Sequence, residues 1–207
     1  MNSNLRVFLS LMAGLSAIMA QARDFRVLAV GADMMEPEIE RQLDSLATAD
    51  GHSISVTDKA LEIAENHPEW DLDEEFIEEA AMLHDIGIFL CDADGIQCFG
   101  TEPYIRHGLL GAELLLKEGF PRHARVCARH TGTGITIQDI REQNLPLPLQ
   151  DYRPETLEEQ IICYADKFFS KTKPDKEKTI DQARASLAKF GPRTLARFDE
   201  WVEKFEE

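Results

Sequence analysis

The sequence reads Ile77-Glu-Glu-Ala-Ala-Met-Leu-His84-Asp85-Ile-Gly87 at its most informative point. Apolar residues recur there with helical spacing, which predicts a helix from about residue 73 to 86 with Gly87 as its terminator. His84 lies on the inward stripe of this helix, and Asp85 follows it directly. Because neighbouring helical residues point about 100° apart, both side chains can reach one metal ion only at a helix end that faces a cavity.

Helical periodicity continues on both sides of this stretch, whereas strand signals are nearly absent after Gly51. The other helices are expected at about residues 52–67, 107–119, 121–131, 138–143, 156–170, 175–190 and 193–206. We therefore expect an all-α helical bundle with one domain over residues 37–207 and an N-terminal extension over residues 1–36.

Metal-binding side chains occur at inward positions that are otherwise apolar. Four helices each contribute one histidine, and a fifth contributes an aspartate: His52, His84, His107, His130 and Asp166. Burying such groups without partners would cost several kcal/mol each, and convergence on a metal ion would offset that cost. These residues and Asp85 are therefore the candidate metal ligands. His67, at a helix end, and His123 are left out of this set.

The order of these ligands resembles the HD superfamily of metal-dependent phosphohydrolases. The stretch His84-Asp-Ile-Gly87 is similar to the HDIG form of its signature. Residues 130–136 and 154–166 resemble a small bacterial and archaeal HDIG group whose members are largely uncharacterised. The resemblance extends over residues 37–207 and implies an HD-domain fold. Phe89 and Leu90 stand near the point where the cyclic-dinucleotide phosphodiesterase branch usually has a lysine, so membership of that branch is not expected.

The resemblance implies a role for each candidate ligand. The ligands of a first metal ion are matched by His52, His84, Asp85 and Asp166. In members with two additional histidines a second metal ion is bridged by the aspartate of the doublet, which implies His107, His130 and Asp85 here. His84 and Asp85 are the expected catalytic residues. Such ligands suit Mn, Fe, Co, Ni or Zn, and we expect one or two divalent transition metal ions per chain.

The expected activity is hydrolysis of a phosphate ester or anhydride in a small nucleotide-like substrate by metal-bound hydroxide. A metal- and nucleotide-binding regulatory module without turnover is the alternative. Arg106, Arg129 and Lys167 each adjoin a candidate ligand and are expected to contact substrate phosphate, unless they point outward as neighbours on a helix do. Specificity is expected in the stretches Cys91–Glu102 and Thr133–Pro154, which frame the ligands.

The formal net charge of the 207 residues is −16. This charge argues against a nucleic-acid polymer as a partner, since phosphate contacts rely on lysine and arginine. It is compatible with a small phosphorylated substrate, because a bound metal ion can be the largest local charge in a site. The sequence leaves the oligomeric state open.

The N-terminal extension has two interpretations. Residues 1–22 contain the three parts of a secretory signal peptide, and an additional helix packed on the domain is the alternative. The apolar stretch is too short for a stable membrane span. We therefore expect a cytoplasmic protein, or an exported one if this segment is cleaved. Residues 27–31 are expected to form a short strand.

Overall fold

The computed structural model describes residues 37–206, with side chains from residue 51 onward. The expected signal peptide or helix of residues 1–22 and the expected strand of residues 27–31 lie outside the described residues. Within the described range, no helix combines the length and the apolar character that a membrane crossing requires.

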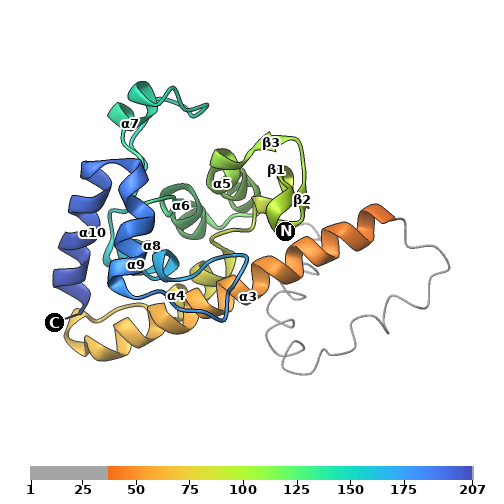
Figure 1. Cartoon of the computed structure of the whole chain (residues 1–207). Helices are drawn as coiled ribbons and strands as arrows, with labels where there is room; N and C mark the ends of the chain where they lie inside the picture. Colours follow the sequence, from red (N-terminus) through yellow and green to blue (C-terminus); the bar gives the residue numbers. More distant parts are fainter. Residues whose placement is uncertain (1–36, 207) are drawn as a thin grey trace.

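A long helix, α3 (Pro37–Asn66), runs along one side of the bundle (Figure 1). Helices α4 (Glu74–Leu83) and α8 (Leu157–Ala165) pack on α3 and on each other. Helix α6 (Pro121–Arg129) packs on both α4 and α8, and α5 (His107–Lys117) packs on α6. These contacts surround a common centre with five helices.

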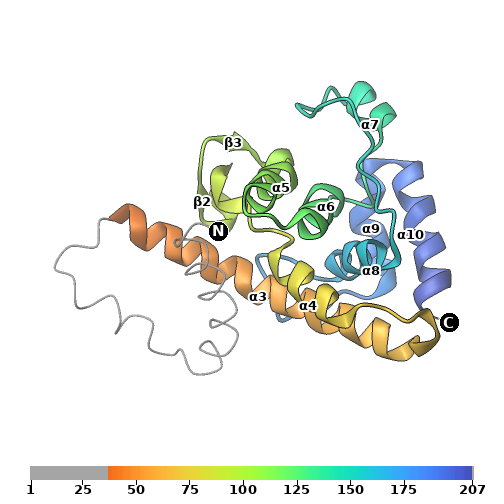
Figure 2. The ribbon, with the colours of Figure 1, turned by 180° about the vertical axis from the view of Figure 1, so that it is seen from behind.

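The remaining helices extend the bundle on the side of α8. Helices α9 (Ile180–Leu187) and α10 (Pro192–Phe205) pack on each other, and α10 also contacts α8. The short helix α7 (Ile137–Glu142) projects from the body near one end of α10 in both views (Figures 1 and 2). Single 3-10 turns occur at Pro68–Trp70, Ile88–Leu90, Asp94–Ile96, Tyr104–Arg106, Asp166–Phe168 and Ala188–Phe190.

The inward stripes expected from the sequence form the core. Val56 of α3, Ile77 of α4 and Ile162 of α8 are fully buried and belong to one apolar cluster. The ring of Tyr164 packs against Phe198 of α10, with ring centroids 5.5 Å apart. The prediction of an all-α bundle is confirmed.

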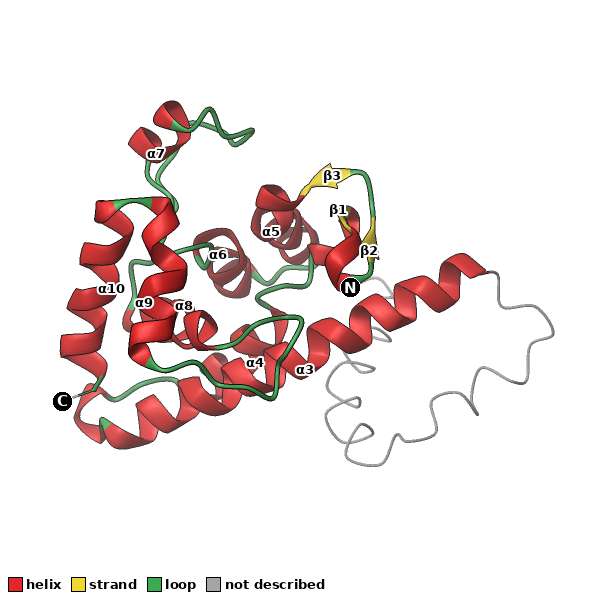
Figure 3. Ribbon diagram, viewed as in Figure 1, coloured by secondary structure: helices red, strands yellow, loops and turns green. Residues whose placement is uncertain are grey.

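The structure adds a small sheet that the sequence did not predict (Figure 3). Its strands are β1 (Cys91–Ala93), β2 (Cys98–Phe99) and β3 (Glu102–Pro103), in the order β2-β1-β3. Strand β1 pairs antiparallel with β2 and parallel with β3. Strands of two or three residues are too short to produce an alternating pattern, which explains why strand signals are nearly absent from this part of the sequence.

Two helix boundaries on either side of residues 170–179 differ from the predicted ones. The helix expected to reach residue 170 ends at Ala165, and an extended residue, Phe169, follows one 3-10 turn. The helix expected from residue 175 begins at Ile180, because Thr179 caps it by accepting a hydrogen bond from the backbone N–H of Gln182. Residues 170–179 therefore form a turn-rich segment next to Asp166.

Candidate metal centre

Helix ends bring the candidate ligands together. Three ligands directly follow the last residue of a helix: His84 after α4, His130 after α6 and Asp166 after α8. His107 begins α5, and His52 lies within α3. Asp85 lies in the turn after α4. The neighbours His84 and Asp85 therefore lie at a helix end, as is necessary for both to reach one metal ion.

The turn after α4 replaces the last helical turn that we expected. Ile86 N–H donates to the carbonyl of Leu83 at 3.0 Å, and Ile88 N–H donates to the carbonyl of Asp85 at 2.9 Å. These bonds span three residues instead of four and tighten the chain. The helix therefore ends at Leu83, three residues earlier than predicted, and the side chains of His84 and Asp85 face the same interior space.

One oxygen of Asp85 faces the first group of ligand atoms. Its Oδ2 lies 3.5 Å from His52 Nε2 and 3.2 Å from His84 Nε2. Asp166 Oδ1 lies 2.9 Å from the same atom of His52 and 3.7 Å from that of His84. Ligand atoms about 2.1 Å from a metal ion are about 3.0 Å apart in octahedral and about 3.4 Å apart in tetrahedral coordination. These separations fit one metal ion.

The other oxygen of Asp85 faces a second group. Its Oδ1 lies 3.4 Å from His107 Nε2 and 3.3 Å from His130 Nε2, and these two nitrogens are 2.9 Å apart. The separations again match ligand atoms that share one ion. Asp85 thus lies between the two groups and presents one oxygen to each.

Backbone carbonyls orient three of the imidazoles. The Nδ1 atoms donate to the carbonyl three residues earlier: His84 to Ala81 at 2.6 Å, His107 to Tyr104 at 2.7 Å and His130 to Cys127 at 2.8 Å. A histidine that donates through Nδ1 can present an unprotonated Nε2 to a metal ion. His52 differs, because its Nδ1 is buried without a hydrogen-bond partner among residues 37–206.

The hydrogen bonding in the centre fits a cation. Neither oxygen of Asp85 has a well-aligned hydrogen-bond donor within the described part of the chain, and both are buried. The Nε2 atoms of His107 and His130 face Asp85 Oδ1, so three electron pairs converge on one point. Such a cluster would be costly in a protein interior unless a positive ion joined it. The donor set of imidazole and carboxylate suits a divalent transition metal.

Burial and charge shift the pKa values of the ligands in opposite directions. Burial lowers the pKa of His107 to about 3 and also lowers that of His130, so both are neutral at pH 7. Burial opposes protonation of His84 too, but the carboxylates of Asp85 and Asp166 raise its pKa to about 9. Without metal, His84 is therefore the imidazole that carries a proton.

Lys171 is a site residue that the sequence interpretation missed. Its Nζ lies 2.7 Å from Asp85 Oδ2, and its side chain is 15% exposed. Burial would raise the pKa of Asp85, but the charges of Lys171 and His84 hold it well below its usual range. The capping residues Thr179 and Gln182 were the available signal, because a helix that starts at residue 180 leaves Lys171 in a turn beside Asp166.

Two glycines allow the ligand-bearing backbones to approach closely. A Cβ on Gly87 would lie 2.2 Å from Gly111 N and 2.4 Å from the carbonyl oxygen of His107. A Cβ on Gly108 would lie 2.3 Å from the carbonyl oxygen of Cys127. Gly87 has φ −86° and lies beyond the end of α4, so its expected role as helix terminator was wrong. Its role is the contact with α5.

A cleft of about 530 Å³ opens onto the ligands. His107, His130 and Asp166 form part of its wall, and Tyr104 and Lys171 line it beside them. The rest of the wall comes mainly from residues 167–190, with Ala93, Gly95 and Ile96 from the segment that contains the sheet. Burial raises the pKa of Tyr104 to about 12.

The three residues expected to contact substrate lie in different surroundings. Lys167 lines the cleft, donates to the carbonyl of His130 at 2.9 Å and lies 2.5 Å from Asp166 Oδ2. Arg106 pairs with Glu102 at 2.5 Å, and Arg129 pairs with Glu155 at 2.8 Å. Neither arginine is part of the cleft wall. Their contact with substrate stays a prediction.

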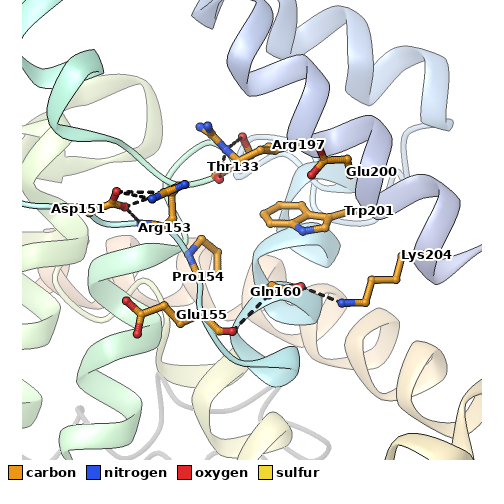
Figure 4. Close-up of a pocket in the computed structure, with 10 residues that line it drawn as sticks. All are labelled: Thr133, Asp151, Arg153, Pro154, Glu155, Gln160, Arg197, Glu200, Trp201 and Lys204. Carbon is orange, nitrogen blue, oxygen red and sulfur yellow. Dashed lines mark hydrogen bonds and ion pairs between the residues drawn. The ribbon is translucent and has the colours of Figure 1, made fainter.

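The stretch Thr133–Pro154 lines a different pocket, of about 410 Å³ (Figure 4). It shares no residue with the cleft, so the expectation that this stretch frames the ligands was wrong. Its basic side chains are engaged locally: Arg153 pairs with Asp151 at 2.8 Å, Arg197 donates to the carbonyl of Thr133 at 3.0 Å, and Lys204 donates to Gln160 at 3.1 Å. Three acidic residues, Asp151, Glu155 and Glu200, balance three basic ones.

The two histidines left out of the ligand set lie away from the centre. His123 pairs with Glu79 at 3.0 Å. His67 stacks on Trp70, with ring centroids 3.8 Å apart. Both therefore have partners that involve no candidate ligand.

A helical bundle with a buried His–Asp doublet and further histidines at helix ends is the arrangement of an HD domain. The family model of the HD domain matches residues 49–170, and the chain belongs to this family. The match contains all six candidate ligands and ends just before Lys171.

Three relatives are similar over part of the chain. An uncharacterized protein of Methanocaldococcus jannaschii is 36% identical over 125 residues, which cover 59% of this chain and 66% of the relative. A tRNA (cytidine(56)-2'-O)-methyltransferase of Picrophilus torridus is 36% identical over 120 residues, 58% of this chain and 30% of the relative. The protein of the same name from Thermoplasma volcanium is 33% identical over 155 residues, which cover 74% of this chain and 40% of the relative. No solved structure matches the chain.

Proposed function

We propose that this protein is a metal-dependent phosphohydrolase that cleaves a phosphate ester or anhydride bond in a small nucleotide-like molecule. The observation that carries the proposal is the position of Asp85, whose two oxygens each face a separate group of imidazole nitrogens. One carboxylate between two such groups is suited to bridge two ions, as two-metal hydrolytic sites require.

The first ion would be held by His52, His84, Asp85 and Asp166. The second would be held by Asp85 with His107 and His130. Divalent metal ions held there would supply activation of water and stabilisation of the negative charge on the phosphate oxygens. Mn, Fe, Co, Ni and Zn all suit these ligands.

The chain's own residues contribute orientation and charge. The backbone carbonyls of Ala81, Tyr104 and Cys127 fix three imidazole rings, so little reorganisation is needed when the ligands are used. Lys167 and Lys171 add positive charge at the mouth of the centre, where a substrate phosphate would lie. The cleft of about 530 Å³ falls within the usual size range of small-molecule sites.

A tRNA substrate is less consistent with the molecule. Two relatives are named tRNA methyltransferases, but the chain spans less than half of each. The net charge of −16 opposes binding of a long polyanion. We therefore propose hydrolysis of a small molecule for this chain, without a nucleic-acid polymer as partner.

Metal analysis and a substrate screen test the proposal together. Purified protein should contain about two transition metal ions per chain and should release phosphate from one class of nucleotides with Mn, Fe, Co or Ni. Asp85→Ala should lose metal and activity but keep its helical circular dichroism. His123→Ala is the matched control, because His123 is an imidazole outside the centre.

Two other outcomes would change the proposal. Full metal content in Asp85→Ala would contradict the ligand assignment. Bound metal without phosphate release from any nucleotide would favour the alternative, a regulatory module that binds metal and nucleotide without turnover.

A further inference from the structure

The cleft continues well beyond the candidate ligands. Its wall contains His107, His130 and Asp166, and it also contains Lys189 and Phe190, which lie between α9 and α10 in the sequence. A single phosphate group held at the metal centre would occupy only the first part of a space of about 530 Å³. The remaining part needs a chemical explanation.

Positive charge dominates the cleft wall. It contains Lys167, Lys171, Lys178 and Lys189 but only one carboxylate, that of Asp166. This concentration of lysines occurs in a chain whose net charge is −16. A surface with an excess of cations at a ligand-sized cleft favours anionic ligands.

The lysines nearest the ligands differ from those farther away. Lys167 and Lys171 pair with Asp166 and Asp85. Among residues 51–206, no carboxylate forms an ion pair with Lys178 or Lys189. Burial lowers the pKa of Lys178; the charge of Asp166 acts in the opposite direction, and the charges of Lys167, Lys171 and Lys189 lower the pKa further. Within the described part of the chain, Lys178 and Lys189 are therefore the two lysines of the cleft wall that form no ion pair.

The segment that carries these lysines is anchored to the bundle. Lys178 Nζ donates to the carbonyls of Lys167 at 3.2 Å and Phe169 at 3.4 Å. Glu177, the preceding residue, pairs with Lys59 of α3 at 2.7 Å. Lys189 Nζ lies 4.9 Å from the centroid of the Phe190 ring. The ammonium groups are thus held in place by local contacts.

We propose that Lys178 and Lys189, together with Lys171, form a subsite for a second phosphate group, so that the substrate carries at least two linked phosphates. This inference rests on the proposed function and specifies its substrate class. All three lysines lie beyond residue 170, where the family match ends, so the match to the HD domain does not include the subsite. Several charged hydrogen bonds are the usual means of binding an oligophosphate.

Binding of two stable phosphonates tests the subsite directly. Methylphosphonate carries one phosphate-like group and methylenediphosphonate carries two, and neither is hydrolysed. Isothermal titration of Mn-saturated protein should give a Kd for the diphosphonate about tenfold lower than that for the monophosphonate, since each charged hydrogen bond contributes on that order. In the double variant Lys178→Met/Lys189→Met, the ratio of the monophosphonate Kd to the diphosphonate Kd should fall to about twofold or less.

Two further variants keep the test decisive. Lys189→Met alone removes an exposed side chain and should reduce the ratio by about threefold even if the double variant folds poorly. Lys176→Met is the matched control, because Lys176 is exposed on the same segment but does not line the cleft. It should leave the ratio unchanged.

The outcomes separate the inference from the proposed function. A preference for the diphosphonate that survives in Lys178→Met/Lys189→Met and in Lys189→Met would arise at the metal ions and would overturn the subsite. Phosphate release by wild-type protein from monophosphates alone would overturn it as well, while the proposed hydrolase would stand. Absence of turnover with a lysine-dependent preference would instead refute the hydrolase and support the subsite.

Discussion

The ammonium group of Lys171 lies 2.7 Å from Oδ2 of Asp85, the same oxygen that faces His52 and His84. Lys171 therefore supplies positive charge at the position where the first metal ion would also supply it. In the metal-free protein the lysine compensates a buried carboxylate. A metal ion in the first group would compete with the lysine for this oxygen.

Replacing Lys171 should have opposite effects on the metal-free fold and on metal binding. Metal-free Lys171→Met should lose about 1–3 kcal/mol of unfolding free energy, less than the about 3–5 kcal/mol of a fully buried pair because the lysine is 15% exposed. Its metal affinity should rise, since the competing cation is gone. Urea unfolding after chelation and metal titration measure the two effects. Equal metal affinity in Lys171→Met and wild type would show that no competition occurs.

Removal of single imidazoles should distinguish the two ligand groups. His107→Ala should retain the first group and bind about one metal ion fewer than wild type, because His107 faces Oδ1 of Asp85, whereas the first group faces Oδ2. Asp85→Ala should lose both ions. Elemental analysis of the dialysed proteins measures the difference, with His123→Ala as control. Loss of all metal in His107→Ala would indicate that the two groups bind as one unit.

Metal binding should depend on pH differently in the two groups. The pKa of His84 is about 9 without metal, so an ion entering the first group at pH 7 must replace a proton. Affinity there should rise with pH, by up to about tenfold per unit, until about pH 9. His107, with a pKa of about 3, has no proton to release, so the second group should show a weaker dependence. Titrations between about pH 6 and about pH 9 with His107→Ala and wild type test this difference.

The same pKa of His84 makes a prediction about stability. The folded pKa of about 9 lies above the ordinary histidine value of 6.5, so the protonated imidazole stabilises the metal-free fold at low pH. This contribution is complete below about pH 6.5 and is lost as pH rises through about 9. Thermal unfolding of chelated His84→Gln should lack this loss. An identical alkaline dependence in His84→Gln and wild type would assign the loss to another group.

A stability effect without a metal effect is expected at Glu159. Its buried carboxylate accepts from Glu155 N–H at 2.6 Å and pairs with Arg125 at 2.7 Å, at the start of α8. Glu159→Ala should therefore lower the unfolding free energy by about 1–3 kcal/mol. Metal content should stay unchanged, because Asp166 lies at the other end of the helix. Glu158→Ala is the control, and urea unfolding is the measurement.

The candidate ligands were predictable because polar residues interrupt apolar stripes. The positions of His52, His84 and His130 on the apolar stripes predicted that they are buried. In the structure each of them is 2% exposed or less. Convergence of these residues followed from the high cost of burying them separately. The ligands divide into two groups by distances between residues that are far apart in the sequence. These distances depend on how the helix ends meet, and no local sequence pattern encodes that.

The lysine-rich part of the cleft was not predictable in the same way. Residues 171–179 were assigned partly to helices, although Pro174 and the capping residue Thr179 favour a turn. The contact between Lys171 and Asp85 joins positions 86 residues apart and arises only from tertiary structure. Lysines in a turn carry no periodic signal, so their common orientation becomes visible only in three dimensions.

The close contacts at Gly87 and Gly108 determine which mutations the site tolerates. Main-chain atoms, not side chains, set the separation of the turn that holds Asp85 from α5, and of α5 from α6. Core side chains elsewhere can therefore be exchanged with little effect on these backbone separations. A single added methyl group at either glycine would instead displace a whole ligand-bearing helix. Mutations of core side chains and mutations of these two glycines should therefore have different consequences: the former change mainly stability, and the latter change the positions of the ligands.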